Sequence, residues 1–128
     1  MNARSPQCPC GSGDSYHGCC EPLHHGERQA HTAEELMRSR YSAYARDDTN
    51  YLFRTWHPRT RPPEVRIDPG ITWTSLEILD TDGGGPEDDR AEVEFAAHYT
   101  TAAGRDALHE RSRFERRAGR WFYVDGDY

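Results

Sequence analysis

All four cysteines of the chain lie between Cys8 and Cys20, in the pattern Cys-x-Cys, eight residues, Cys-Cys. Three glycines interrupt this stretch, and glycine allows the positive φ angles with which so short a loop can curl around an ion. Zinc takes four sulfur or nitrogen ligands in a tetrahedron, with Zn–S distances of about 2.3 Å. A site with four thiolates has no open position for a substrate. The pattern therefore predicts a small zinc knuckle with a structural metal, whose ligands are Cys8, Cys10, Cys19 and Cys20.

Other interpretations exist for the fourth ligand and for the thiols. His24, His25 or His17 could take the place of Cys20, because histidine nitrogen is also a zinc ligand. A disulfide framework is disfavoured, since residues 1–7 are polar and contain no apolar secretory segment. A redox pair is disfavoured as well, because the chain has no Cys-x-x-Cys motif. The polar N-terminal residues therefore lead us to expect a reducing, cytoplasmic compartment.

The composition allows one small domain beside this knuckle. The chain has 128 residues, a net charge of −6 and a mean hydropathy of −1.02. Its three Trp, seven Tyr and four Phe offer large apolar surfaces, so we expect a small core despite the polar composition. No apolar stretch reaches the ~18–20 residues of a membrane span, so no membrane association is expected. The region around the cysteines is acidic, unlike the basic knuckles that bind phosphates, which makes nucleic acid an unfavoured partner.

Two short helices are predicted after the knuckle. Thr32-Ala33-Glu34-Glu35 has the form of a capping box, in which the Thr32 hydroxyl accepts from the Glu35 amide and the Glu35 carboxylate returns the bond. An apolar stripe with helical spacing continues from there to Tyr44. A second helix is expected from Tyr51 to Trp56, ending before Pro58 because a residue that precedes proline avoids the helical region.

A sheet is predicted in the second half of the chain. From Ile71 the apolar period changes to two, with a bulge expected near Thr74–Ser75 and an exposed, flexible loop at 80–89. Alternating apolar residues predict further strands over 91–99, 108–114 and 120–124. The expected fold class is α+β, a cone-like domain of short helices packed on a curved, mostly antiparallel sheet.

Arg40 falls inside the apolar stripe of the first predicted helix. A buried charge needs a partner, and Glu110 is the expected one because it shares a strand face with Leu108 and Phe114. A structural ion pair between helix and sheet is one interpretation, and a guanidinium that reaches solvent past its neighbours is another. A third is a ligand cavity with a few convergent polar groups, for which the candidate residues are Arg40, Tyr44, Trp56, His57, Glu110, Ser112 and Trp121.

The chain resembles two known families. Cys-Pro-Cys-Gly-Ser-Gly at 8–13, followed by Tyr16 and then Cys19-Cys20, resembles the SEC-C motif, the zinc module at the tail of the protein-translocase motor SecA. In that family the last ligand is often His, where this chain has Cys20. The YchJ family of small bacterial proteins is similar in three further places, which are Thr32–Tyr44, Tyr51-Leu52 with Thr55-Trp56-His57-Pro58, and His109-Glu110 through Phe114 to Gly119-Arg120-Trp121. The resemblance implies a zinc module with its connector at 1–28 and a nuclear-transport-factor-two-like (NTF2-like) domain at 29–128. It implies no established activity.

These observations support two functions of different classes. The preferred one is a protein-interaction module, in which the knuckle presents Tyr16, His17 and Pro22 to a protein partner and the cone serves as a scaffold. The resemblance suggests a partner in export or translation, because the similar knuckle of SecA-like proteins docks onto a chaperone or the ribosome. The alternative is a small-molecule-binding protein or enzyme that uses the cavity around Arg40 and Glu110. No residue is assigned a catalytic role, so binding is favoured over catalysis.

Overall fold

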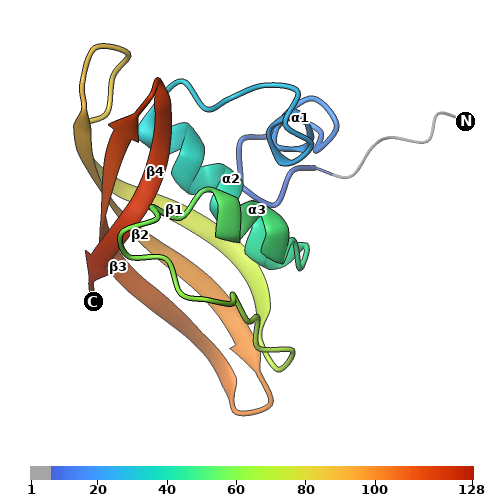
Figure 1. Cartoon of the computed structure of the whole chain (residues 1–128). Helices are drawn as coiled ribbons and strands as arrows, with labels where there is room; N and C mark the ends of the chain where they lie inside the picture. The colour runs from blue at the N-terminus through green and yellow to red at the C-terminus, as the bar shows by residue number, and fades with distance from the viewer. Residues whose placement is uncertain (1–6) are drawn as a thin grey trace, which may run out of the picture.

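The protein folds as a curved, four-stranded antiparallel sheet with helices on its concave side (Figure 1). A computed structural model describes residues 7–128, so residues 1–6 of the polar N-terminal tail lie outside the described residues. The strands are adjacent in chain order, from β1 (Thr72–Gly83) through β2 (Arg90–Thr101) and β3 (Gly104–Arg117) to β4 (Arg120–Asp127). The predicted α+β class is confirmed.

The helices form a second layer, and the N-terminal segment lies against them. The long helix α2 (Ala33–Ala45) crosses the concave face of the sheet, and α3 (Thr49–Arg54) lies beside it (Figure 1). The short α1 (Glu21–His24) and the cysteine loop lie against α2 (Figure 1), and Gly11 of the loop comes close to the backbone of Leu76 in edge strand β1. Within residues 7–128, no helix has the length and apolar character needed to cross a membrane.

The inner face of the sheet is the apolar face, as the alternating pattern predicts. Alternate residues of β2, from Ala91 to Ala97, are buried, as is Phe114 on β3. The predicted bulge in β1 is confirmed, because the pairing with β2 shifts register between Trp73 and Ser75. A second register shift, between Ile78 and Asp80, is not evident from the sequence. The two shifts bend the edge strand around α2, since bulges increase strand twist.

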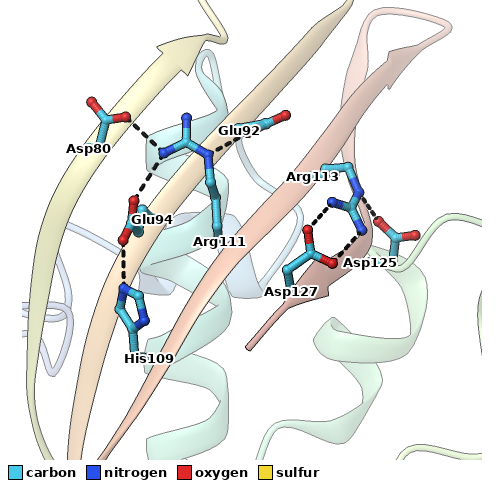
Figure 2. A network of polar contacts seen from close by, with 8 residues as sticks. All are labelled: Asp80, Glu92, Glu94, His109, Arg111, Arg113, Asp125 and Asp127. Carbon is cyan, nitrogen blue, oxygen red and sulfur yellow. Dashed lines mark hydrogen bonds and ion pairs between the residues drawn. The ribbon is translucent and has the colours of Figure 1, made fainter.

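The outer face of the sheet carries a network of ion pairs (Figure 2). Arg111 lies 2.8 Å from an oxygen of Asp80 and 3.0 Å from an oxygen of Glu94, and it also contacts Glu92. Beside it, Arg113 pairs with two carboxylates of β4, Asp125 and Asp127, while His109 contacts Glu94. Exposed pairs of this kind contribute little stability one by one. Their main effect is to keep this face in water, so that the opposite face forms the core.

Helix α2 begins as the sequence predicts, with one difference. The Thr32 hydroxyl accepts from the Glu35 amide at 3.1 Å, which confirms the helix start. The Glu35 carboxylate does not return the bond to Thr32, as the capping box would require. One of its oxygens accepts from the amide of His31 at 2.8 Å, and the other pairs with Arg28. The connector before α2 is therefore held to the helix start by the same carboxylate.

The second helix begins and ends two residues earlier than predicted. Asp48 caps α3, because its carboxylate accepts from the Tyr51 amide at 3.1 Å. The chain then leaves the helix, and residues 55–57 run alongside β4, with Trp56 paired to Tyr123 in a parallel bridge. The Tyr123 amide donates to the carbonyl of Thr55, and its carbonyl accepts from the amide of His57. This pairing holds Trp56 against the sheet.

The loop predicted at 80–89 is shorter and more ordered than expected. Strand β1 continues to Gly83, and the following residue, Gly84, is buried. The Gly84 carbonyl accepts from the Ala33 amide at 3.3 Å, so the loop is attached to the start of α2. A Cβ atom at Gly84 would lie 2.9 Å from the Cβ of Ala33 and 3.0 Å from that of Ala91. The glycines here allow close packing, and only residues 85–89 remain a surface loop.

Candidate metal centre and cavity

The structure brings the four cysteine sulfurs into one cluster. Each of the four Sγ atoms lies within 4.8 Å of the others, and all four thiols are free. The Sγ atom of Cys19 lies 3.6 Å from that of Cys10 and 3.9 Å from that of Cys20. Zn–S bonds of 2.3 Å at tetrahedral angles place neighbouring sulfurs about 3.8 Å apart. These two separations are close to that value, and the whole cluster is compact enough to hold one tetrahedral metal ion.

Backbone hydrogen bonds hold the loop in this shape. The Cys8 amide donates to the carbonyl of Asp14 at 2.8 Å, and the Gly11 amide donates to the carbonyl of Cys8 at 3.2 Å. Gly11 and Gly13 adopt φ angles of 81° and 88°, as the sequence predicts. Gly18 does not have a positive φ, so its presence is not explained by backbone conformation. Cys8, Cys10 and Cys20 are buried, whereas Cys19 is partly exposed.

The thiols perturb one another strongly. Hydrogen bonds with the Cys10 and Cys20 thiols lower the pKa of Cys8, while hydrogen bonds with the Cys10 and Cys8 thiols raise the pKa of Cys20. Burial raises the pKa of Cys19 to about 11. Without a cation, one sulfur can thus ionise only while its neighbours keep their protons. A divalent metal at the centre would reverse this balance, because it stabilises coordinated thiolates.

Helix α2 contacts this cluster directly. The Ser42 hydroxyl, fully buried in the last turn of the helix, lies 3.8 Å from the Sγ atom of Cys8. Nη1 of Arg38 donates to the carbonyl of Cys10 at 2.7 Å, and Nε of the same guanidinium pairs with Glu34. Ser12, from the loop itself, lies 3.2 Å from the Sγ atom of Cys19. Helix α2 therefore supplies outer contacts to two of the four cysteines.

The alternative histidine ligands do not join the cluster. Both nitrogens of buried His24 are used elsewhere, since Nδ1 lies 2.7 Å from the Tyr16 hydroxyl and Nε2 lies 2.8 Å from the Ser39 carbonyl. His17 is exposed and pairs with Glu21, and His25 is exposed. The proposal of His24 as fourth ligand is wrong in this geometry. Its ring links the knuckle to α2 through these two hydrogen bonds.

The hydrogen bonds of His24 determine its tautomer. A carbonyl can only accept, so Nε2 carries the proton that is donated to Ser39, and Nδ1 accepts from the hydroxyl of Tyr16. Burial lowers the pKa of His24, which agrees with a neutral ring. The Tyr16 ring is itself buried, with the Arg46 guanidinium 3.7 Å from its centroid. Tyr16 is therefore not available to a partner at the knuckle surface.

A cavity of about 200 Å³ lies between α2 and the concave face of the sheet. Five of the seven predicted cavity residues line it, namely Arg40, Tyr44, Trp56, Glu110 and Ser112. Most of the remaining wall is aromatic, and it includes Trp73, Phe95 and Tyr123. Strand periodicity predicts that Tyr123 faces the helices, but which inward residues surround an opening depends on where α2 crosses the sheet.

His57 and Trp121 do not line the cavity, and these two predictions are wrong. His57 lies beyond the end of α3, where its ring packs against Phe122 and its Nδ1 accepts from the Arg59 amide at 3.0 Å. Trp121 does lie on the inner face, but under the start of α2, where its indole N–H donates to the His31 carbonyl at 3.3 Å. Tyr123, two residues further along β4, takes the position beside Arg40 that was predicted for Trp121.

The predicted ion pair between Arg40 and Glu110 does not form within residues 7–128. Nη1 of Arg40 donates to the Leu52 carbonyl at 2.9 Å and to the Thr55 hydroxyl at 2.7 Å. Glu110 accepts from the hydroxyl of Ser112, and from that of Tyr123 at 3.0 Å. The ring of Tyr123 lies between the two charges, with its centroid 4.7 Å from the guanidinium carbon of Arg40. Helix and sheet are thus linked through an aromatic ring.

Comparison with known proteins places this arrangement among others of the same kind. Residues 32–126 match the family model of YchJ, middle NTF2-like domain. A UPF0225 protein of Streptomyces coelicolor is 52% identical over 124 residues, covering 97% of both chains, and one of Deinococcus radiodurans is 49% identical over 92% of this chain and 86% of its own. The solution structure of a SEC-C motif containing protein from Rhodopseudomonas palustris superposes with a TM-score of 0.82 at 35% identity, covering 94% of this chain and 96% of that one. The crystal structure of a SEC-C motif containing protein from Psychrobacter arcticus superposes with a TM-score of 0.76 at 29% identity, covering 92% of this chain and 80% of that one.

Proposed function

The chain belongs to the UPF0225 family and carries a YchJ-type NTF2-like domain. We propose that it is a zinc-stabilised binding protein, in which the metal is structural and the cavity of the NTF2-like domain is the ligand-binding site. The observation that supports the metal is the cluster of four free thiols at tetrahedral spacing. The observation that supports binding is the aromatic cavity with a few polar groups, Arg40, Glu110 and Ser112, on its walls.

Zinc fits this donor set better than the hard divalent metals of the cell. Four thiolates are soft ligands, and tetrahedral thiolate sites favour zinc over magnesium, calcium or manganese, which prefer oxygen. With four protein ligands the metal would have no open coordination position, so it would bind neither water nor substrate. When bound, zinc supplies the positive charge that allows all four thiols to be deprotonated. A reducing compartment is needed to keep the thiols free, and we therefore place the protein in the cytoplasm.

The proposed role of the metal is to fasten the knuckle onto α2. The knuckle is too small to have an apolar core of its own, and its contacts with the helix, at Ser42 and Arg38, depend on the positions of Cys8 and Cys10. Helix α2 also forms a wall of the cavity, through Arg40 and Tyr44. Metal binding on one side of the helix would thus stabilise the cavity on the other side.

Metal analysis of the purified, reduced protein tests the zinc site. We expect one zinc per chain, and a thiolate-to-metal charge-transfer band when cobalt replaces zinc. Cys10→Ser should lose the metal, because it removes a buried ligand, while His17→Ala should keep it, because His17 is exposed and lies outside the cluster. Full metal occupancy in Cys10→Ser, or none in the wild type, would show that the cluster is not a zinc site.

Filling the cavity tests the binding function. Ala97 lies in the cavity wall, and Ala96, its neighbour on β2, points to the opposite face of the sheet. A screen of small fragments of both charges by NMR should identify ligands for the wild type and for Ala96→Leu. Ala97→Leu should lose them, because the added methyl groups occupy the cavity. Fragments that bind Ala97→Leu and wild type equally would place the binding site elsewhere.

The other proposal, that the knuckle binds a protein partner, now concerns a smaller surface. Because Tyr16 is buried, a partner would contact the outer edge of the loop, where Ser12, Asp14 and His17 are exposed, and Pro22, which is partly exposed. An Asp14→Arg variant keeps the four thiols, so it should bind zinc as the wild type does and lose only a partner that docks on this edge. No observation favours this surface over the cavity, which is why binding in the cavity is ranked first.

A further inference from the structure

Arg40 is a buried cation without an anionic partner. Its side chain sits in the wall of the cavity and the residue is only 5% exposed, which lowers the pKa of the guanidinium. Both hydrogens of Nη1 are used, by the Leu52 carbonyl and the Thr55 hydroxyl. No carboxylate within residues 7–128 forms an ion pair with it. A guanidinium stays charged under such conditions, so the burial of this charge is compensated only by two neutral acceptors and by aromatic rings.

The unused side of the guanidinium opens into the cavity. The Nε and Nη2 groups of Arg40 donate to no partner among residues 7–128. In the same part of the chain, the one side-chain nitrogen or oxygen that is both sealed from solvent and unpartnered is Nε1 of Trp56. The free N–H groups of Arg40 therefore keep access to open space, and the cavity is the space that this buried side chain lines. The Trp56 ring, whose centroid lies 5.2 Å from the guanidinium carbon, covers Arg40 on one side, but its sealed N–H is not open to the cavity.

The opposite wall has no corresponding need for a ligand. The Glu110 carboxylate accepts from the hydroxyls of Ser112 and Tyr123. Its charge is also the main cause of the raised pKa of Tyr128, another residue of the cavity wall. Burial and then the Glu110 charge raise the pKa of Tyr123, so this hydroxyl also remains a donor. Two hydroxyls thus donate to the carboxylate, whereas Arg40 has an unused pair of donor groups.

From this asymmetry we infer that the cavity binds a small carboxylate with an aromatic or other apolar body, which receives hydrogen bonds from Nε and Nη2 of Arg40. This inference rests on the proposed function of the cavity and names its ligand class. Planar carboxylates match the donor geometry of a guanidinium, and the rings of Trp73, Phe95 and Tyr44 provide the apolar surface for the body. A space of about 200 Å³ is below the range of drug-sized sites, so the ligand is small, on the order of ten non-hydrogen atoms.

A cationic ligand is the opposite case, since an aromatic cavity with a carboxylate can also bind amines. In this cavity the rings of Trp56 and Tyr123 are already occupied by the guanidinium of Arg40, whose carbon lies 5.2 Å and 4.7 Å from their centroids. A second cation would lie close to the first in a buried site. The two cases predict opposite effects of charge on binding, and this makes them separable.

The test compares three probes of the same shape on the zinc-loaded, full-length protein. Benzoate, benzamide and benzylamine differ mainly in charge, and NMR titration reports both affinity and the residues that shift. Benzoate should bind with a Kd of about 1 mM or tighter. Benzamide should bind about tenfold to a hundredfold more weakly, because it replaces a charge-assisted pair of hydrogen bonds by neutral ones. Benzylamine should not bind.

Variants then assign the effect to Arg40. Arg40→Met should abolish the preference for benzoate over benzamide, and Arg40→Lys keeps the charge but should bind benzoate less tightly than wild type. Arg66→Met, which removes an exposed arginine remote from the cavity, is the matched control and should bind benzoate normally. Glu110→Gln should bind benzoate at least as tightly as wild type, since it removes a repelling charge. If Arg40→Met does not fold, the three probes measured on the wild type and on Glu110→Gln still decide whether the cavity prefers a carboxylate.

The outcomes distinguish the ligand class from the cavity itself. Binding of benzylamine in place of benzoate, or loss of benzoate binding in Glu110→Gln, overturns the carboxylate assignment but leaves a ligand-binding cavity. Equal affinity for benzoate and benzamide also overturns it, because Arg40 would then contribute no specific contact. If none of the three probes shifts the cavity signals at about 10 mM, both this assignment and the proposed binding function fail.

Discussion

His24 offers a direct test of how the knuckle is attached to α2. The residue is 5% exposed, and its two hydrogen bonds connect Tyr16 of the cysteine loop with the Ser39 carbonyl of the helix. Its ring also packs on Tyr51, with centroids 4.7 Å apart. His24→Phe keeps a ring of similar size and should retain much of this packing. Both hydrogen bonds disappear, and the Tyr16 hydroxyl loses its acceptor.

The cost follows from those two bonds. A net hydrogen bond is worth about 1 kcal/mol, and a buried group left without a partner costs about 1–3 kcal/mol. The Ser39 carbonyl is in a helix, where it also accepts a backbone bond, so most of the cost falls on the hydroxyl of Tyr16. We therefore expect His24→Phe to lower the free energy of unfolding by about 2–4 kcal/mol. For a chain of this length that corresponds to a fall in Tm of roughly 10 °C.

Partial replacements separate the two bonds. His24→Gln can place an amide nitrogen near the position of Nε2 and keep the bond to Ser39, while His24→Asn can place an oxygen near Nδ1 and keep the bond from Tyr16. Each should cost about half as much as His24→Phe. Tyr16→Phe removes the same bond as His24→Gln, so in the double variant the second change should add little to the first.

Calorimetry and metal analysis on the same samples complete the test. All His24 variants should hold zinc with the stoichiometry of the wild type, because His24 is outside the cysteine cluster. Loss of zinc in His24→Asn and His24→Phe alike would mean that His24 is a ligand after all. A fall in stability of less than about 0.5 kcal/mol in His24→Phe would refute the reasoning about the buried bonds.

Three further predictions concern other parts of the structure. Gly84→Ala should lower the free energy of unfolding by about 2–4 kcal/mol in chemical denaturation, because φ is +90° and the new Cβ meets Ala33. Gly119→Ala, with φ of +78° and no atom within 4 Å, should cost only about 1–2 kcal/mol for the backbone conformation. Equal losses in the two variants would contradict the packing argument. Ser42→Ala should weaken zinc binding about tenfold in a chelator competition, unless the contact with Cys8 is incidental. Burial lowers the pKa of His24, so the unfolded chain takes up a proton at this residue before the folded chain does, as the pH falls through about 6.5. The wild type then loses stability, and the difference in unfolding free energy between wild type and His24→Phe should shrink from pH 8 to pH 5.5. A constant difference would show that His24 does not titrate.

Much of the fold could be predicted from local patterns. The cap at Thr32 and the bulge after Trp73 depend on a few neighbouring residues, so the sequence is sufficient to locate them. The alternation along β2 and β3 similarly predicts which residues face inward, including Glu110 and Ser112. The errors lie at element ends, such as the start of α3, where a carboxylate cap at Asp48 outweighs the apolar pattern.

The chain alone determined that four thiols would be close together, because they are separated by so few residues that any compact loop gathers them. It also determined the inner face of each strand, because side chains alternate with a period of two. Only the tertiary structure decided the partners of Arg40, the role of His24, and the choice of Tyr123 over Trp121 beside the cavity. These outcomes depend on where α2 crosses the curved sheet, and this position arises from packing between residues that are far apart in the sequence.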